Sequence, residues 1–183
     1  MKVIALKGEK RKQTGSKVAK KIRQEGKVPC VFYGNGQNVH FDVFLNDFNT
    51  LVYSPETYIV QLDLNEEQYI CKLQDIQFHP VNEKILHIDF FQVFDDKEVK
   101  MIIPVKFEGN SPGVRLQGGI LSKNKRKLFV KALPKNLPDF IKADVSTLNL
   151  NDKITIEDLK DENYSFIHPD NMVVCQVKMS RAS

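Results

Sequence analysis

The sequence predicts a mainly β protein with a few short helices. From residue 28 onward, apolar and polar residues alternate with a period of two over many short segments, which is the pattern of strands that bury one face. Connections that contain glycine or proline separate these segments, and only two short stretches have helical spacing. Many short strands with few helices favour β-barrels or sandwiches. The length of 183 residues fits one large domain or two small ones.

The N-terminal segment is predicted to contain a strand, a loop and a helix. Residues 2–6 alternate weakly and favour a strand, whereas the polar stretch 8–15 begins and ends with glycine and favours a loop. A helix is expected over 17–25, with Ser16 as its N-cap and Gly26 as the residue that ends it. A helix this short must pack on a core to be stable, which would hold its lysines outward. Its period separates two sets of side chains, Val18, Ala19 and Ile22 on one side, and Lys17, Lys20, Lys21 and Gln24 on the other.

The remaining elements follow from the period-two segments. Turn signals at 34–36 and 65–66 predict two hairpins, and residues 46–52 favour a short helix between them. Strands are expected over 28–34, 39–45, 57–64, 67–73 and 84–93, and then over 99–107, 127–133, 138–145 and 171–179.

Positive charge is concentrated at the N-terminus. Residues 1–27 hold ten lysines or arginines and two glutamates, a net charge of +8, although the whole chain carries only +4. Residues 28–93 sum to −7 and residues 94–183 to +3. This shift in composition, followed by a new strand pattern, predicts a first domain over 1–93 and a second, mainly β domain over 94–183.

The cationic block is typical of surfaces that bind polyanions, so RNA binding rather than catalysis is the first hypothesis. The alternative is a solvated charged face or a disordered tail. Binding is favoured because apolar residues beside the lysines should order the helix. In the adjoining loop, Gln13, Thr14 and Ser16 are suited to hydrogen bonds with phosphates and sugar hydroxyls. A second basic run at 123–127 indicates a solvated hairpin tip or an auxiliary RNA contact.

The pair His87 and Asp89 has two interpretations. At i and i+2 they share one face of a strand, and with Asp75 they could serve a hydrolase or nuclease as acid and base. No nucleophile elbow, P-loop or metal-ligand spacing accompanies them, so a structural pair or an RNA contact is favoured. Tyr33, beside Gly34 at a strand end, is the aromatic side chain best placed to stack on a base.

Several classes of protein are disfavoured. The three cysteines, Cys30, Cys71 and Cys175, fit neither a zinc site nor a disulfide framework, and we expect no metal, no cofactor and no small-molecule substrate. No apolar run approaches the roughly 20 residues that cross a bilayer, so no membrane partner is expected. The basic N-terminus lacks the features of a secretory signal, and a reducing cytoplasm is the expected location.

Ordered motifs along nearly the whole chain resemble one known family. They are RKQTGSKVAKKIRQEGKVPCVFYG, QDIQFHP, LHIDF, PGVRLQGGIL, LPDFIKADVSTL and ITIEDL. Together they are similar to the bacterial large-subunit ribosomal protein numbered twenty-five, in its two-domain form, also called the Ctc general stress protein. The resemblance implies a six-stranded β-barrel as the N-terminal domain. It also implies binding to loop E of 5S ribosomal RNA, a ribosome-associated protein acting as one copy, and no enzymatic activity.

The resemblance, together with the charge block, predicts the RNA contacts. Family members often have arginine where Lys20 and Lys21 stand, so planar bidentate contacts are replaced here by ammonium groups. A stress-related protein-interaction module acting through the second domain stays an alternative, as does an RNA-processing hydrolase. The candidate RNA-binding residues are Lys10, Arg11, Gln13, Thr14, Gly15, Ser16, Lys17, Lys20, Lys21, Arg23, Tyr33, Gly34, His87 and Asp89.

Overall fold

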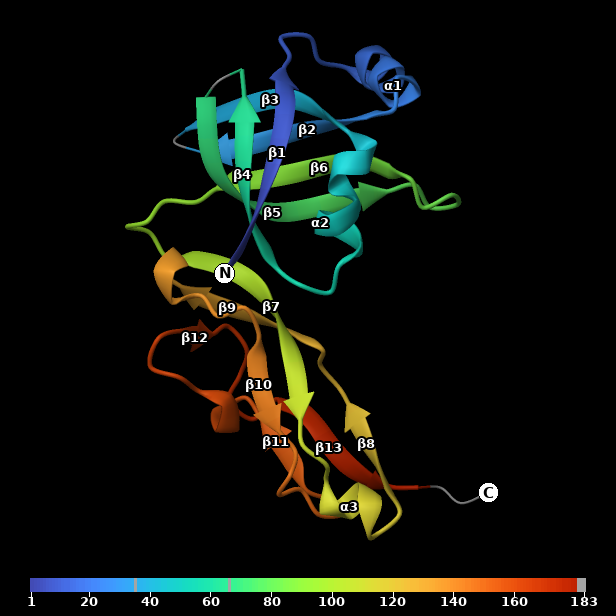
Figure 1. Cartoon of the computed structure of the whole chain (residues 1–183), viewed down its shortest axis with the longest axis vertical. Coiled ribbons are helices and arrows are strands. Elements are labelled where there is room, and N and C mark those ends of the chain that lie inside the picture. The colour runs from blue at the N-terminus through green and yellow to red at the C-terminus, as the bar shows by residue number, and fades with distance from the viewer. Residues whose placement is uncertain (35, 66, 181–183) are drawn as a thin grey trace. The chain divides into compact units, whose positions relative to one another are not determined.

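Strands dominate the chain, as the sequence predicts, and its helices are short (Figure 1). The computed structural model describes residues 1–34, 36–65 and 67–180. The chain divides into two compact units, Met1–Lys97 and a second that begins at Glu98. Asn35 and Glu66, which belong to the two predicted hairpin turns, lie outside the described residues.

The first unit is a closed six-stranded β-barrel, which confirms the predicted fold. Its strands are β1 (Lys2–Lys10), β2 (Lys27–Gly34), β3 (Gln37–Phe44), β4 (Tyr58–Leu64), β5 (Glu67–Phe78) and β6 (Ile85–Gln92). They are hydrogen-bonded in the order β1-β3-β2-β6-β5-β4. The barrel closes because β1 pairs with β4 in parallel from Lys2 to Gly8 and with β3 at Glu9 and Lys10. Three short helices complete the unit: α1 (Ser16–Gln24), η1 (Leu45–Phe48) and α2 (Asn49–Tyr53).

The barrel interior is filled by alternate residues of each strand. In β4, for example, Tyr58, Val60, Leu62 and Leu64 are buried and the residues between them are half-buried. Phenylalanines occupy the centre of the core, where the Phe90 ring lies 5.9 Å from that of Phe41 and 6.4 Å from that of Phe48. Because the interior takes every second residue, the intervening side chains of β2, β3 and β6 face outward.

Two local predictions for the N-terminal segment are wrong. Strand β1 continues through Lys10, into the stretch that was predicted as a loop from Gly8 onward. Ser16 is the first helical residue rather than the N-cap; Gly15 occupies the cap position, and no side chain caps the helix. The predicted end of the helix is confirmed, because Gly26 follows the C-cap with φ of 76°, a conformation that glycine adopts without strain.

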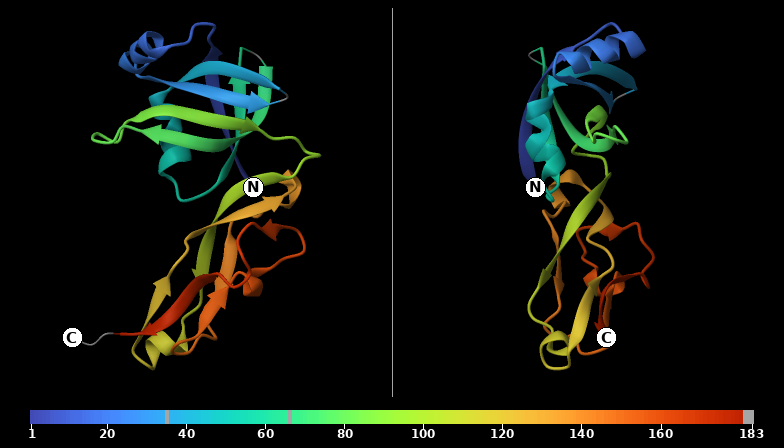
Figure 2. Two further views of the ribbon diagram at one scale, coloured as in Figure 1. Left: turned by 180° about the vertical axis from the view of Figure 1, so that it is seen from behind. Right: turned by 90° about the vertical axis from the view of Figure 1, so that its right-hand side faces the viewer.

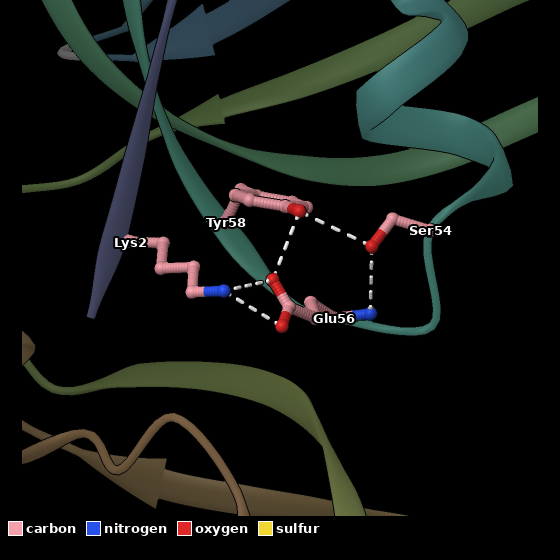
Figure 3. Close-up of polar contacts among 4 residues, drawn as sticks. All are labelled: Lys2, Ser54, Glu56 and Tyr58. Atoms are coloured by element: carbon pink, nitrogen blue, oxygen red, sulfur yellow. Dashed lines mark hydrogen bonds and ion pairs between the residues drawn. The ribbon is translucent and has the colours of Figure 1, made fainter.

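A polar network joins the start of β1 to the connection that leads into β4 (Figure 3). Lys2 Nζ contacts both carboxylate oxygens of Glu56, at 2.7 and 2.5 Å. The Tyr58 hydroxyl donates to Glu56 Oε2 at 3.0 Å and lies 3.1 Å from Ser54 Oγ. Exposed ion pairs of this kind contribute at most about 1 kcal/mol to the free energy of unfolding. The network therefore adds little stability to the parallel pairing of β1 with β4.

The second unit contains two small sheets (Figure 2). The first has the order β10-β7-β9-β12 and the second the order β11-β13-β8. Their strands are β7 (Val99–Glu108), β8 (Gly119–Lys123), β9 (Lys127–Ala132), β10 (Ile141–Asp144), β11 (Lys153–Thr155), β12 (Ser165–Phe166) and β13 (Val173–Met179). The helical turns are α3 (Pro112–Arg115), η2 (Pro134–Asn136) and η3 (Glu157–Leu159). Within the described parts of both units, no helix is long and apolar enough to span a membrane.

The second basic run is not a hairpin tip. Residues 124–126 connect β8 to β9, and these strands belong to different sheets. The backbone N–H groups of Asn124 and Lys125 both donate to the carbonyl oxygen of Val174, which fixes the connection against β13.

Candidate nucleic-acid interface

The outer face of β3, β2 and β6 brings together several of the predicted site residues. These strands are neighbours in the barrel, and Figure 2 (left) shows them side by side. In the register of the sheet, Val31 of β2 lies opposite His40 of β3 on one side and opposite Asp89 of β6 on the other. Because their neighbours Phe41 and Phe90 fill the core, His40 and Asp89 project outward.

The Asp89 carboxylate links β2 to β6. One oxygen, Oδ2, accepts a hydrogen bond from the Tyr33 hydroxyl at 3.2 Å. The other, Oδ1, lies 2.6 Å from His87 Nδ1, although the geometry of this contact is not that of a hydrogen bond. Burial, and then the negative charge of Asp89, raises the pKa of Tyr33, so its hydroxyl remains protonated and serves as the donor.

Arg11 and His40 lie beside this cluster. The backbone N–H of Arg11 donates to the carbonyl oxygen of His40 at 2.9 Å, which continues the β1–β3 ladder by one residue. The Nε atom of Arg11 is buried and has no hydrogen-bond partner. Leaving such a donor buried and unsatisfied is a cost to the folded chain. Sequence reasoning missed His40, although its outward position in the predicted strand 39–45 was a usable signal.

Helix α1 is held against the barrel by its apolar stripe. Ile22 is buried and Val18 and Ala19 are half-buried, as predicted. The Arg23 Nε donates to the carbonyl oxygen of Leu86 at 3.0 Å and ties the helix to the start of β6. The side of the helix opposite the stripe is exposed and carries Lys17, Lys20, Lys21 and Gln24.

The loop before α1 is exposed at Gln13 and Thr14. Gly15 ends it with φ of 113°, and its carbonyl oxygen accepts from the backbone N–H of Ala19 at 3.0 Å. Ser16 is exposed at the start of the helix. The loop therefore leads directly from Arg11 to the exposed lysines of α1, and it places polar side chains between them.

Two of the predicted residues, Lys10 and Gly34, also make contacts within the first unit. Lys10 Nζ contacts Glu67 Oε2 at 2.7 Å and lies 5.7 Å from the centre of the Tyr69 ring. The hydrogen bond to Glu67 raises the pKa of Lys10, so this ammonium group is paired with a carboxylate on the barrel surface. Gly34 is required by packing, because the Gln92 side chain lies directly over it and leaves no room for a Cβ atom.

Acidification is expected to destabilise the first unit through His40. Burial, and then the charges of Arg11 and His87, lower the pKa of His40 below its usual 6.5. Since the pKa is lower in the folded state, the unfolded chain binds the proton more readily. The contribution of the neutral imidazole is therefore complete above pH 6.5 and is lost as the pH falls through the folded pKa.

Urea unfolding at about pH 7.5 and about pH 5.5 should reveal this loss. Tyrosine fluorescence is a suitable signal, because four of the five tyrosines lie in the first unit. His40→Gln should lose less stability between the two pH values than the unaltered protein. An equal loss in both proteins would contradict the assignment.

The structure brings two of the residues of the hydrolase alternative to neighbouring positions but does not form a catalytic site around them. Asp75 of β5 lies opposite Asp89 of β6, so the sheet does bring the two carboxylates to neighbouring positions. Among the described residues, however, no group of three or more His, Cys, Asp or Glu side chains is arranged to hold a metal ion. Cys30, the nearest thiol on β2, points into the core, and burial raises its pKa well above the usual value.

Comparison with known proteins identifies the family. Residues 6–90 match the model of the ribosomal L25p family, and residues 98–181 match that of the C-terminal domain of ribosomal protein TL5. The large ribosomal subunit protein bL25 of Christiangramia forsetii is 44% identical over 99% of this chain and 83% of its own length. Those of Cytophaga hutchinsonii and Porphyromonas gingivalis are each 43% identical over 100% of this chain, and over 94% and 96% of their own lengths.

These matches define a structural component of the large ribosomal subunit rather than an enzyme. The chain belongs to the ribosomal L25p family, in the two-domain form whose second domain is of the TL5 type. The family predicted from the sequence motifs is therefore confirmed. His87 and Asp89 belong to a ribosomal protein, and the interpretation as an RNA-processing hydrolase is set aside.

Proposed function

We propose that the first domain, residues 1–93, binds 5S ribosomal RNA at loop E through the outer face of β3, β2 and β6 together with α1 and the loop before it. The observation that carries this proposal is the Asp89 carboxylate, which holds the Tyr33 hydroxyl and the His87 imidazole together on an outward surface. The protein acts as a single copy on cytoplasmic ribosomes. RNA is the polyanion expected for a member of this ribosomal family.

The chemistry of an irregular RNA duplex suits this surface. An A-form helix offers its shallow minor groove, its 2′-hydroxyls and the base edges of distorted internal loops. The fixed groups of the barrel, His87 and Tyr33, can hydrogen-bond to hydroxyls and base edges in one geometry. The half-buried Arg11 side chain lies beside His40, and its guanidinium group carries donors suited to RNA oxygens.

The lysines of α1 contribute to the affinity for RNA rather than to its sequence- or shape-specific recognition. Lys17, Lys20 and Lys21 are exposed, and an ammonium group binds phosphate as a point charge without the bidentate geometry of arginine. Contacts of this kind release counterions, so the affinity should fall as the salt concentration rises. Helix packing matters here because Ile22 and the Arg23–Leu86 bond keep the lysines in a constant position relative to β6.

A gel shift with the full chain tests the proposal. The protein should bind 5S RNA more tightly than an unrelated RNA duplex of equal length at the same salt concentration. A chain ending at residue 93 should retain that preference. Equal affinity for the two RNAs would refute specific recognition, and loss of the preference on truncation would refute its assignment to the first domain.

Replacing Lys20 and Lys21 together with glutamine should weaken binding to 5S RNA about tenfold near 100 mM salt. If each lysine neutralises one phosphate, the slope of log K against log salt should fall by about 2. The matched control is Lys7→Gln with Lys97→Gln, which removes the same charge from exposed positions of the same unit. An unchanged slope in the α1 variant, or an equal fall in the control, would show that these lysines do not contact phosphate.

A further inference from the structure

The outward face of the β10-β7-β9 sheet in the second unit is rich in lysine. Alternate residues of β7 and β9 are buried, among them Met101, Ile103, Leu128 and Val130. The intervening side chains therefore project from the other side of the sheet. We call this surface the lysine face; its cations are Lys100, Lys106, Lys127, Lys131 and Lys142, and all five are exposed.

The register of the sheet places these lysines opposite one another. Lys100 of β7 lies opposite Lys131 of β9, and Lys106 of β7 lies opposite Lys142 of β10. Like charges directly opposite on neighbouring strands destabilise a sheet. Two such pairs on one face are therefore a cost to folding, and a bound polyanion would offset it.

Acidic side chains limit the face without neutralising it. Glu98 pairs with Lys131 at 2.5 Å and Glu108 with Lys142 at 3.8 Å, and both pairs are about half exposed, so water and salt screen them. Beyond Lys106 the character of the sheet changes, because Glu108 lies opposite Asp144. The basic stretch thus runs along β7 from Lys100 to Lys106, a distance of about 20 Å at roughly 3.3 Å per residue.

Aromatic rings lie beside three of the lysines. Lys100 Nζ lies 4.7 Å from the centre of the Phe129 ring, and Lys106 Nζ and Lys142 Nζ lie 3.8 and 5.8 Å from that of Phe140. Cation–π contacts of this kind hold an ammonium group in place without cancelling its charge. Between the lysine rows, Ile102 lies opposite Phe129, and they are 44% and 38% exposed.

We propose that the lysine face is a second RNA-binding surface, distinct from the barrel, which contacts the phosphodiester backbone of an RNA segment. A linear polyanion matches lysines that are spread along a strand, and lysine binds phosphate as a point charge. The exposed apolar side chains of the face, such as Ile102, Phe129 and Ile167, lie among lysines, whereas the buried centre of a stable protein interface is depleted in charged residues. We expect recognition of the backbone because lysine ammonium groups bind phosphates without reading the base sequence.

Lysine footprinting of the full chain tests this directly. The protein is acetylated with and without an RNA duplex of unrelated sequence, and each lysine is quantified by mass spectrometry. RNA should slow acetylation of the lysine face several-fold, whereas Lys135, Lys153 and Lys178, which are exposed elsewhere in the same unit, should react at an unchanged rate. Protection equal to that of these three lysines, or equal protection by polyglutamate, would overturn the proposal.

A pair of charge-matched variants gives an independent measurement. In a chain that already carries K17Q, K20Q and K21Q, the variant K106Q/K127Q/K131Q should bind the duplex about tenfold more weakly near 100 mM salt. Its salt slope should fall by about 2–3. The control K135Q/K153Q/K178Q carries the same net charge and should bind as its parent does. Equal weakening in both variants, or none in either, would show that the face makes no phosphate contacts; thermal unfolding of each variant confirms that it is folded.

Discussion

Replacing Phe90 with alanine is expected to lower the free energy of unfolding of the first unit by about 3–5 kcal/mol, the range for deleting a fully buried phenylalanine. The side chain is 0% exposed, and its ring packs between those of Phe41 and Phe48. Because Phe90 follows Asp89 on β6, a cavity beneath that strand should also loosen the outward cluster. Binding to 5S RNA is expected to weaken with the loss of stability.

Phe91 provides a matched control, since it is the next residue and the same side chain on the opposite face. It is 43% exposed, and its ring lies 5.6 Å from Lys72 Nζ. Phe91→Ala should therefore cost no more than about 1 kcal/mol. Urea unfolding followed by tyrosine fluorescence measures both variants. A similar cost for the two substitutions would show that the inward and outward faces of β6 have been assigned wrongly.

The strands of the barrel could be predicted because apolar and polar residues alternate along most of them, but the length of β1 could not. Gly8 was interpreted as the start of a loop, whereas it lies inside the strand. A Cβ atom there would lie 2.9 Å from carbons of both Leu64 and Phe41, so the glycine is needed for close packing of the barrel wall. The sequence alone does not distinguish a glycine in a turn from a glycine against which neighbouring side chains pack closely.

The candidate site was predicted in its parts but not in its arrangement. Charge and helical period identified the lysines of α1, and spacing identified His87 and Asp89 as one face of a strand. The contact between Tyr33 and Asp89, and the position of Arg11 beside His40, depend on strand order and register. These are set by long-range pairing, which local periodicity does not contain.

In the second unit the short elements escaped prediction. Strands β11 and β12 have three and two residues, too few to show a period. Pro112 and Gly113 open the helical turn α3. Its N-cap is Ser111, whose hydroxyl oxygen accepts a hydrogen bond from the Val114 N–H. The lysine face was missed for the same reason as the Asp89 cluster, since it arises from three strands in register.

Replacing Asp89 with alanine is expected to weaken binding to 5S RNA by about 10- to 100-fold. The carboxylate accepts from Tyr33 and contacts His87, and hydrogen bonds to a charged group are worth about 1.5–3 kcal/mol, where 1.4 kcal/mol is tenfold in affinity. Without it, both side chains lose the position that the proposed interface requires. Tyr33→Phe removes only the hydroxyl and should produce part of the effect.

The control Asp75→Ala makes this prediction discriminating. Asp75 lies opposite Asp89 on β5 and is exposed, so its removal deletes the same negative charge at a neighbouring position. If Asp89 acted only through its charge, both substitutions would reduce repulsion of the phosphates and tighten binding. If Asp89 positions Tyr33 and His87, the two variants should change the affinity in opposite directions. Tighter binding by both variants would therefore refute a positioning role for Asp89, whereas tighter binding by Asp75→Ala alone would support it.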